Sequence, residues 1–292
     1  MEIKVNKKVF WKPKNILKLR LPQIIAKFII TRISTTFSID LISLAYSQAG
    51  ILNYRNEKES GEYHLISTWL KHFLTIQNVT QPCFLDIGAN EGNNCKLLNL
   101  FHPFSTIYAF EPNPYTYKQL LLLSSKSPQI IPNNLGVAEI IGSMELFIRE
   151  NNNSSPHASI YGKVLTDVHG YTDVQKVKIQ VITLDSFCEQ NDIRQIDFLK
   201  IDTEGNELNV LRGSTNSLRN GIIKSIQFEF NEMNVYSRVF LRDFYDLLKD
   251  FNFYRLLSKS LLPLDYSCKH EIFQFQNILA VRKDLDLVLY DD

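Results

Sequence analysis

The chain has 292 residues, of which 45% are hydrophobic, and its formal net charge is +1. This composition is that of a globular protein with a sizeable core, and the near-zero overall charge indicates no particular partner. The cysteines lie far apart without a C-x-x-C pair, which argues against a disulfide scaffold or a cysteine zinc site, so we expect free thiols in a reducing compartment: Cys83, Cys95, Cys188 and Cys268.

Charge is unevenly distributed along the chain. Residues 1–32 contain nine lysines and arginines but one acid, Glu2, whereas the other 260 residues carry 23 basic and 30 acidic side chains. The apolar stretch 21–30 is interrupted by Pro22, Gln23 and Lys27 and is too short to span a bilayer. The sequence therefore predicts a cytoplasmic protein whose basic segment either contacts an anionic membrane surface or packs on the rest of the chain.

The first 78 residues read as a helical extension. Apolar residues recur at helical spacing between positions 17 and 29, and similar patterns occupy residues 39–52 and 63–73. None of these segments alternates with a predicted strand. We therefore expect a helical basic N-terminal region over residues 1–78 and a separate domain over residues 79–292.

The remainder alternates between strands and helices. Short apolar runs typical of buried parallel strands are followed by helical patterns at 94–100 and 115–123, and a helix is expected at 240–251. Residues 144–148 and 177–182 are expected to form an inserted edge pair. This alternation predicts an α/β fold with a doubly wound, mostly parallel sheet that binds ligands at the carboxyl ends of its strands. The expected strands are 83–87, 106–110, 129–131, 196–201, 225–230 and 277–282.

A glycine-containing loop follows the first strand, in the sequence FLDIGANEGN (84–93). Gly88 and Gly92 permit a sharp turn and close approach of a ligand. Asn90 stands where the dinucleotide fingerprint G-x-G-x-x-G has its middle glycine, so the loop departs from that pattern. Asp86, at the end of the strand, can orient the loop or reach the cationic end of a ligand.

An acid also ends the second strand, where Glu111 is followed by Pro112 and Asn113. A carboxylate in this position accepts hydrogen bonds from both hydroxyls of a bound ribose. The alternative is that Glu111 caps the helix that begins near Pro114. The spacing from the glycine loop favours the ribose role.

The strand 196–201 leads into a third acidic turn, Asp202-Thr203-Glu204-Gly205. We expect Asp202 and Glu204 to face the same cleft, with Asp202 as the first candidate for a general base and Glu204 as the second. Both could instead cap the helix at 206–211. His157 is a further candidate for the base, although its place in the polar loop 151–158 favours an exposed loop residue. No metal site is predicted, although Asp202, Glu204 and Glu229 are an alternative Mg²⁺ set.

The motifs together resemble the FkbM-type methyltransferases, which depend on S-adenosylmethionine (SAM). The resemblance covers residues 83–230 through five blocks in order: DIGANEGN (86–93), FEPNP (110–114), GVAEIIG (136–142), TLDSF (183–187) and DFLKIDTEGNE (197–207). It implies a Rossmann-like class I methyltransferase fold and O-methylation of a sugar, polysaccharide, glycolipid or glycosylated natural product. Carried over by position, it implies cofactor contacts from Asp86, Gly88, Ala89, Asn90, Gly92, Glu111, Pro112, Asn113 and Gly136.

Other functions compete with this one. A methyltransferase acting on nucleic acid or another small molecule would share the fold, as would a nicotinamide-dependent oxidoreductase, although the loop lacks the middle glycine of a dinucleotide site. A non-catalytic membrane- or nucleic-acid-binding module is the alternative of a different class. Few basic residues cluster outside residues 4–32, so we expect no nucleic-acid partner.

Overall fold

The computed structural model describes residues 23–151 and 157–285. The chain divides into two compact units, residues 1–45 and 46–292. The described part of the first unit holds helix α1 (Gln23–Phe37) and most of helix α2 (Leu41–Gln48). Much of the predicted basic segment 1–32 lies outside the described residues.

Helices α1 and α2 carry exposed apolar side chains, among them Phe28, Phe37 and Ile42. Among the described residues, no single helix is long and apolar enough to cross a membrane. The segments Ile25–Phe37 and Leu41–Gln48 meet the length and composition requirement only as a pair, which is bent by 111°.

The second unit is built on an eight-stranded sheet with the order β10-β9-β11-β8-β7-β1-β2-β3. The run β3-β2-β1-β7-β8 is parallel, and β11, β9 and β10 continue it with antiparallel pairing. The crossover between β1 and β7 is the switch point of a doubly wound sheet, as predicted. The strands are β1 (Cys83–Ile87), β2 (Thr106–Phe110), β3 (Ile130–Asn133), β7 (Phe198–Ile201), β8 (Ser225–Phe230), β9 (Phe251–Leu257), β10 (Ser260–Pro263) and β11 (Gln276–Arg282).

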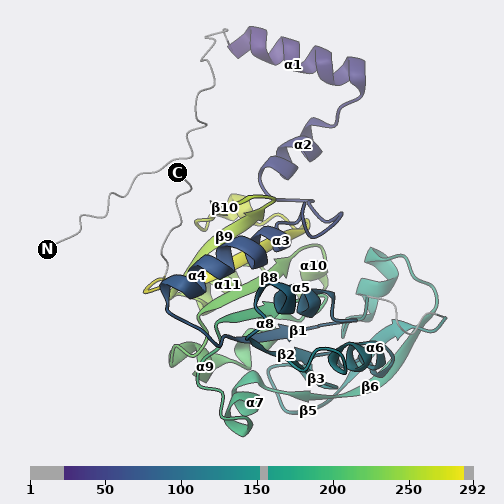
Figure 1. Cartoon of the computed structure of the whole chain (residues 1–292). Helices are drawn as coiled ribbons and strands as arrows, with labels where there is room; N and C mark the ends of the chain where they lie inside the picture. The colour runs from purple at the N-terminus through teal and green to yellow at the C-terminus, as the bar shows by residue number, and fades with distance from the viewer. Residues whose placement is uncertain (1–22, 152–156, 286–292) are drawn as a thin grey trace, which may run out of the picture. The chain divides into compact units, whose positions relative to one another are not determined.

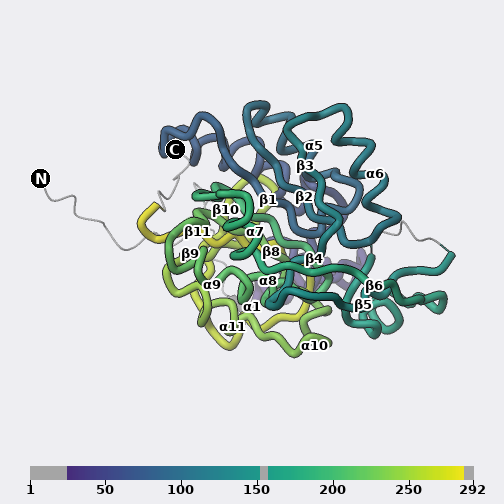
Figure 2. Tube along the Cα trace, turned by 90° about the horizontal axis from the view of Figure 1, so that it is seen from below, coloured from purple at the N-terminus to yellow at the C-terminus, as the bar shows by residue number. Residues whose placement is uncertain are grey.

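Helices cover both faces of this sheet (Figure 1). Viewed along the sheet, α5 and α6 lie on one side of the strands, and α9 and α11 lie on the other (Figure 2). One layer contains α3 (Glu62–His64), the π-helical turn η1 (Leu65–Trp69), α4 (Leu70–Ile76), α5 (Asn93–Phe101) and α6 (Pro114–Ser124). The other contains α7 (Leu184–Gln190), α8 (Glu207–Arg212), α9 (Thr215–Arg219) and α11 (Leu241–Leu247).

Strand β1 shows why its sequence is apolar almost throughout. Successive side chains point to opposite faces of a sheet. Phe84 packs in the layer with η1, α4 and α5, whereas Leu85 and Ile87 pack in the layer with α7 and α8. Both faces of the strand are therefore buried. Asp86, the charged residue of the strand, is completely buried as well.

The helices around residues 62–76 belong to the second unit. Leu65, Ile66 and Leu70 are completely buried in the core layer that also contains Phe84. The structural division therefore falls between Ala45 and Tyr46, whereas the sequence places a domain boundary after residue 78. The boundary lies earlier than the sequence suggests because the apolar face of the helices at 62–76 is buried against the sheet of the second unit.

A second, three-stranded sheet has the order β4-β6-β5. Its strands are β4 (Gly136–Val137), β5 (Gly142–Arg149) and β6 (Val174–Ile182), and all of β5 pairs antiparallel with residues 174–181 of β6. This is the inserted pair that the sequence predicts at 144–148 and 177–182. The segment between β5 and β6 returns to the switch point of the main sheet, where Ser159 Oγ donates to the Glu204 carbonyl at 2.7 Å.

Candidate active site

The glycine loop makes a tight turn between β1 and α5. Gly88 has a φ of 84°, and a Cβ at this position would lie 1.8 Å from the carbonyl oxygen of Asp202. Only glycine fits both this backbone conformation and this contact. The backbone N–H groups of Gly88 and Ala89 donate to the Phe110 carbonyl at 3.0 and 2.8 Å, which fixes the loop to the end of β2.

Glu111 ties the loop to the second strand. Its carboxylate accepts hydrogen bonds from the backbone N–H groups of Asn90 at 2.9 Å and Asn113 at 2.8 Å. Burial raises the pKa of Glu111 to about 7, and the two backbone donors oppose that effect. The residue lines the main cavity, so a ribose there would meet a carboxylate that is already oriented.

Two buried oxygens beside the loop have no hydrogen-bond partner among the described residues: Asp86 Oδ1 and Asn90 Oδ1. The other carboxylate oxygen of Asp86, Oδ2, accepts from Cys95 Sγ at 3.1 Å. An unpaired buried acceptor is costly unless a ligand or water supplies a donor. The ammonium and hydroxyl groups of SAM are donors of this kind, so these residues fit the predicted cofactor.

The other predicted cofactor residues divide into two groups. Pro112 and Gly136 line the main cavity, and Ala89 lines an adjoining one. Gly92 and Asn113 line neither. Gly92 precedes α5 with a φ of 81°, and the Asn113 side chain caps α6 by accepting from the Tyr115 N–H at 3.1 Å. These last two positions therefore shape helix starts around the site.

A row of buried polar side chains crosses the sheet below the loop. In the strand register, Asp86 of β1 lies opposite Lys200 of β7, and Lys200 lies opposite Gln227 of β8. Lys200 Nζ lies 2.8 Å from Asp202 Oδ2 and 3.9 Å from Glu62 Oε1. Burial acts to lower the pKa of Lys200, but the surrounding carboxylates outweigh it and hold that pKa well above its usual value. Lys200 is therefore a fixed buried cation.

The two predicted catalytic carboxylates, Asp202 and Glu204, line the same cavity as Glu111. Burial raises the pKa of Asp202 above its usual value, although Lys200 opposes this. Burial also acts to raise the pKa of Glu204, but hydrogen bonds from His157 and His169 outweigh it and bring that pKa below its usual value. Glu204 is therefore ionised at neutral pH.

His157 lies in a loop, as the sequence suggests, but its side chain is only 35% exposed and contacts Glu204. His169 was not singled out at all. His157 Nδ1 lies 3.1 Å from Glu204 Oε1, and His169 Nε2 lies 3.3 Å from Glu204 Oε2. The histidines are 47 and 35 residues away from Glu204 in the chain, so no local spacing could reveal the cluster. Among the described residues, the side chains close enough together to share a metal ion are His157, His169 and Glu204. The alternative Mg²⁺ set of Asp202, Glu204 and Glu229 does not form such a group.

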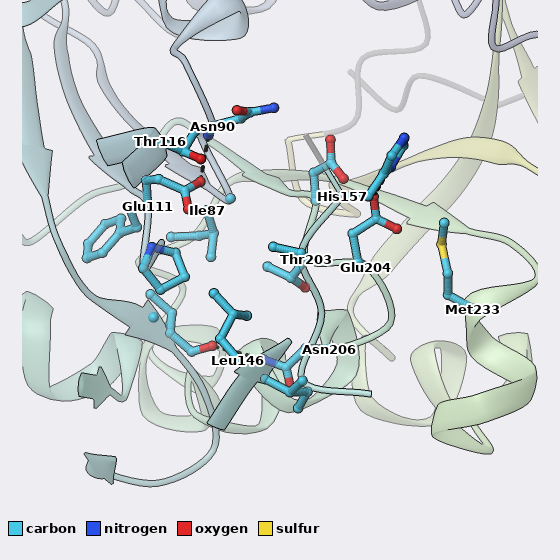
Figure 3. A pocket seen from close by; sticks show the side chains of 18 of the residues that line it. Ile87, Asn90, Glu111, Thr116, Leu146, His157, Thr203, Glu204, Asn206 and Met233 are labelled. Carbon is cyan, nitrogen blue, oxygen red and sulfur yellow. Dashed lines mark hydrogen bonds and ion pairs between the residues drawn. The ribbon is translucent and has the colours of Figure 1, made fainter. Parts of the chain in front are cut away.

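The cavity that joins these groups has a volume of about 450 Å³, within the usual range for small-molecule sites. Asn90 and Glu111 lie on one side, and His157, Glu204 and Met233 lie on the other (Figure 3). Sequence reasoning missed much of the lining, because it comes from the inserted sheet, from loops and from the helices α6 and α10 (Met233–Ser237), which local periodicity does not place at the site: Thr116, Leu135, Met144, Leu146, Ile179, Val181, Asn206 and Met233.

Comparison with known proteins identifies one family. The family described as "Methyltransferase FkbM domain" matches residues 86–256, more than half of the chain. The hexuronic acid methyltransferase AglP of Haloferax volcanii is 28% identical over 135 residues, which are 46% of this chain and 50% of AglP. The 2-O-methyltransferase NoeI of Sinorhizobium fredii is 19% identical over 188 residues, 62% of this chain and 76% of NoeI. The chain thus spans half the length of AglP.

Solved structures to which the chain shows some similarity include the plantazolicin methyltransferase BpumL in complex with SAH. It is 9% identical, with a TM-score of 0.41 and coverage of 89% of this chain and 98% of BpumL. Fibrillarin of Aeropyrum pernix with natively bound S-adenosyl-L-methionine is 12% identical, with a TM-score of 0.36 and coverage of 75% of this chain and 76% of the fibrillarin chain.

Proposed function

The chain belongs to the FkbM methyltransferase domain family and has its Rossmann-like class I fold, and from this premise we propose that it is a SAM-dependent O-methyltransferase acting on a sugar hydroxyl. The observation that carries the proposal is that the loop at Gly88, the acid Glu111 and the turn with Asp202 and Glu204 line one cavity. The two ends of that cavity suit two different ligands, a nucleoside cofactor at Glu111 and an acceptor near Glu204.

Asp86, Asn90 and Glu111 would hold the cofactor. Glu111 presents an oriented carboxylate for the ribose, while the buried, unpartnered oxygens of Asp86 and Asn90 would accept hydrogen bonds from the amino-acid end. SAM, when bound, supplies a methyl group on a positively charged sulfur. The buried carboxylates around it suit a cationic ligand, with Lys200 balancing part of their charge.

The residues of the chain would then chiefly position the acceptor and remove its proton. Holding two reactants in line can supply about 7–11 kcal/mol of the barrier. A sugar hydroxyl is a poor nucleophile until it begins to lose its proton, so a general base is expected. Asp202 is the first candidate because its carboxylate lines both cavities and is held in place by Lys200 at 2.8 Å. Glu204 is the second candidate.

The acceptor class is supported by the two relatives. AglP is named for a hexuronic acid and NoeI for 2-O-methylation, and both descriptions fit methyl transfer to a sugar. For this chain we propose a sugar hydroxyl in a glycan, glycolipid or glycosylated small molecule. Transfer of the labelled methyl group from SAM to glycans and glycolipids tests this. Calorimetry with SAM and with NAD tests the oxidoreductase alternative, and binding of NAD alone would overturn the proposal.

Asp202→Asn tests the role of the general base, because it keeps the shape of the side chain and removes its charge. We expect kcat to fall by about 10²–10⁴-fold, while SAM affinity and melting temperature change little. Asp192→Asn is the matched control, since Asp192 is exposed and lines neither cavity. Full activity in Asp202→Asn would rule out this role and leave Glu204 as the candidate.

We further propose a cytoplasmic location with peripheral contact between residues 1–32 and an anionic membrane surface. Nine lysines and arginines in this segment, together with the exposed Phe28 on α1, support this. Basic side chains near apolar ones are what such contact requires. A membrane-associated acceptor such as a glycolipid would then be brought close to the enzyme.

A further inference from the structure

His157, His169 and Glu204 form a cluster on the wall of the cavity. Each offers one atom that can bind a metal, and these atoms all lie within 4.8 Å of one another. The two nitrogen-to-oxygen distances are 3.1 and 3.3 Å. Ligand atoms about 2.1 Å from a shared ion, at angles between octahedral and tetrahedral, lie roughly 3.0–3.4 Å apart. The two distances run to different carboxylate oxygens, so the cluster is compact enough for a metal's ligand shell and would close around one ion after a small rotation of its side chains.

The imidazole rings are held by neighbouring side chains. The two rings stack with their centroids 3.8 Å apart, and the Tyr171 ring lies parallel to that of His169 at 5.8 Å. Arg149 covers Tyr171 at 4.4 Å from the ring centroid and forms two hydrogen bonds with Asp173 at 3.2 Å. This arrangement of rings and charges fixes both histidines in front of Glu204.

Glu204 is held equally firmly. It has a left-handed backbone with a φ of 54°, a conformation that non-glycine residues adopt only when their surroundings require it. The hydroxyl of Ser159 donates to its carbonyl oxygen at 2.7 Å. Its side chain is mostly buried and directs one carboxylate oxygen at each histidine. Both the left-handed backbone of Glu204 and the burial of its carboxylate cost free energy of folding. Packing alone does not account for this cost, whereas binding of a ligand between the two imidazoles does.

The charge around the cluster favours a cation. Asp202, Glu229 and Glu232 line the same cavity as Glu204. The buried cation of this region, Lys200, is already paired with Asp202 and Glu62. A positive ion beside Glu204 would therefore reduce the repulsion between these carboxylates.

We propose that His157, His169 and Glu204 bind one divalent transition-metal ion. Imidazole nitrogen with one carboxylate suits Zn²⁺, Mn²⁺, Fe²⁺ or Co²⁺, whereas Mg²⁺ and Ca²⁺ prefer all-oxygen sites. Three protein ligands leave at least one coordination position open to the cavity. An oxygen of the acceptor would take that position, and this last role rests on the proposed function.

Direct metal binding tests the proposal without reference to activity. The full-length chain without a histidine tag is treated with chelator and titrated by calorimetry with Zn²⁺, Co²⁺ and Mg²⁺. We expect one equivalent of Zn²⁺ or Co²⁺ to bind, and Mg²⁺ to bind far more weakly. His157→Ala, His169→Ala and Glu204→Gln should each weaken Zn²⁺ binding by tenfold or more, because each removes one ligand of three.

His72→Ala is the matched control, since His72 is exposed on α4 and lines neither cavity. Zn²⁺ should also raise the melting temperature of the wild type but not of the three site variants. If one variant fails to fold, the remaining two still decide the question. Absence of stoichiometric binding to the wild type, or equal losses in His72→Ala and the site variants, would overturn the proposal.

SAM calorimetry on the metal-free chain separates this inference from the proposed function. Binding of SAM with methyl transfer that persists in chelator, and no binding of Zn²⁺, would overturn the metal site alone. Binding of Zn²⁺ through the three residues without any binding of SAM would support the site and count against the methyltransferase function.

Discussion

At the scale of single residues, Glu111 connects the geometry of the loop to cofactor binding. Its carboxylate holds the Asn90 and Asn113 backbones and faces the cavity. A charged acceptor for ribose hydroxyls contributes about 1.5–3 kcal/mol per hydrogen bond. Glu111→Gln keeps the side-chain volume while removing the charge. We expect SAM binding, measured by calorimetry, to weaken about 10- to 150-fold.

Glu91→Gln is the control for that substitution, because Glu91 lies in the same loop but is exposed. Its SAM affinity should equal that of the wild type. An unchanged dissociation constant in Glu111→Gln would rule out the ribose assignment.

The pH dependence of SAM binding follows from the same residue. Burial raises the pKa of Glu111 from 4.5 to about 7. Ribose hydroxyls donate to the ionised form, so we expect affinity to fall by up to about tenfold per pH unit below pH 7. Calorimetry across a pH series measures this. The dependence should flatten in Glu111→Gln, and an identical profile there would assign it to another group.

The stability of the ligand-free protein should change in the opposite direction. A carboxyl group with a raised folded-state pKa contributes stability that is fully present below its unfolded value and is lost as pH rises through the folded value. For Glu111 this window runs from 4.5 to about 7. Melting temperatures across that window should therefore fall less steeply in Glu111→Gln than in the wild type.

At the scale of elements, the turn between β1 and α5 depends on Gly88. Alanine there would require both a φ of 84° and a Cβ 1.8 Å from the Asp202 carbonyl oxygen. Because that oxygen belongs to the backbone, the turn between β7 and α8 would have to move. We expect Gly88→Ala to abolish SAM binding and to lower the melting temperature, as measured by calorimetry and thermal unfolding.

Gly170→Ala separates the two causes. Gly170 has a similar φ of 69°, but nothing lies within 4 Å of its Cβ position. It should therefore show only the backbone cost, roughly 1 kcal/mol. Equal destabilisation by the two substitutions would show that the close contact at Gly88 is unimportant.

Elements with a single clear signal were predictable from the sequence. The residues of β1, β2 and β8 agree with the predicted strands, because each is an apolar or alternating run next to a loop. Strands β9 and β10 were missed. Strand β9 begins at Phe251, which was assigned to the preceding helix, and that helix ends at Leu247. Both faces of β9 are largely buried, so no alternation marks the boundary.

The candidate site likewise contains residues that the sequence predicts and residues that it does not. Asp86, Glu111 and Asp202 were predictable because each stands at or near the carboxyl end of a strand, and those ends meet at one edge of the sheet. His169 was not predictable. It reaches Glu204 through the fold of the segment between β5 and β6, and this depends on packing that local periodicity does not encode.

At the scale of the whole molecule, the chain combines a strongly basic N-terminal segment with a remainder in which acidic side chains outnumber basic ones by 30 to 23. Residues 1–32 carry nine lysines and arginines, and the described part of this region continues into α1 and α2 with exposed apolar side chains. Each basic side chain near an anionic membrane surface contributes about 1 kcal/mol before screening by salt. Apolar side chains add to this when they enter the interface.

Sedimentation with liposomes that contain anionic lipid tests this contact. We expect the full-length chain to sediment at low salt and to be released by high salt, whereas chains that begin at Ser34 or Tyr46 remain in the supernatant. The full-length double variant Lys27→Glu, Arg32→Glu keeps every apolar residue and lowers the local charge by four. Its affinity should fall by at least tenfold if the attraction is electrostatic. Equal sedimentation with neutral liposomes would indicate apolar insertion, and no sedimentation of the full-length chain would show that the segment is structural.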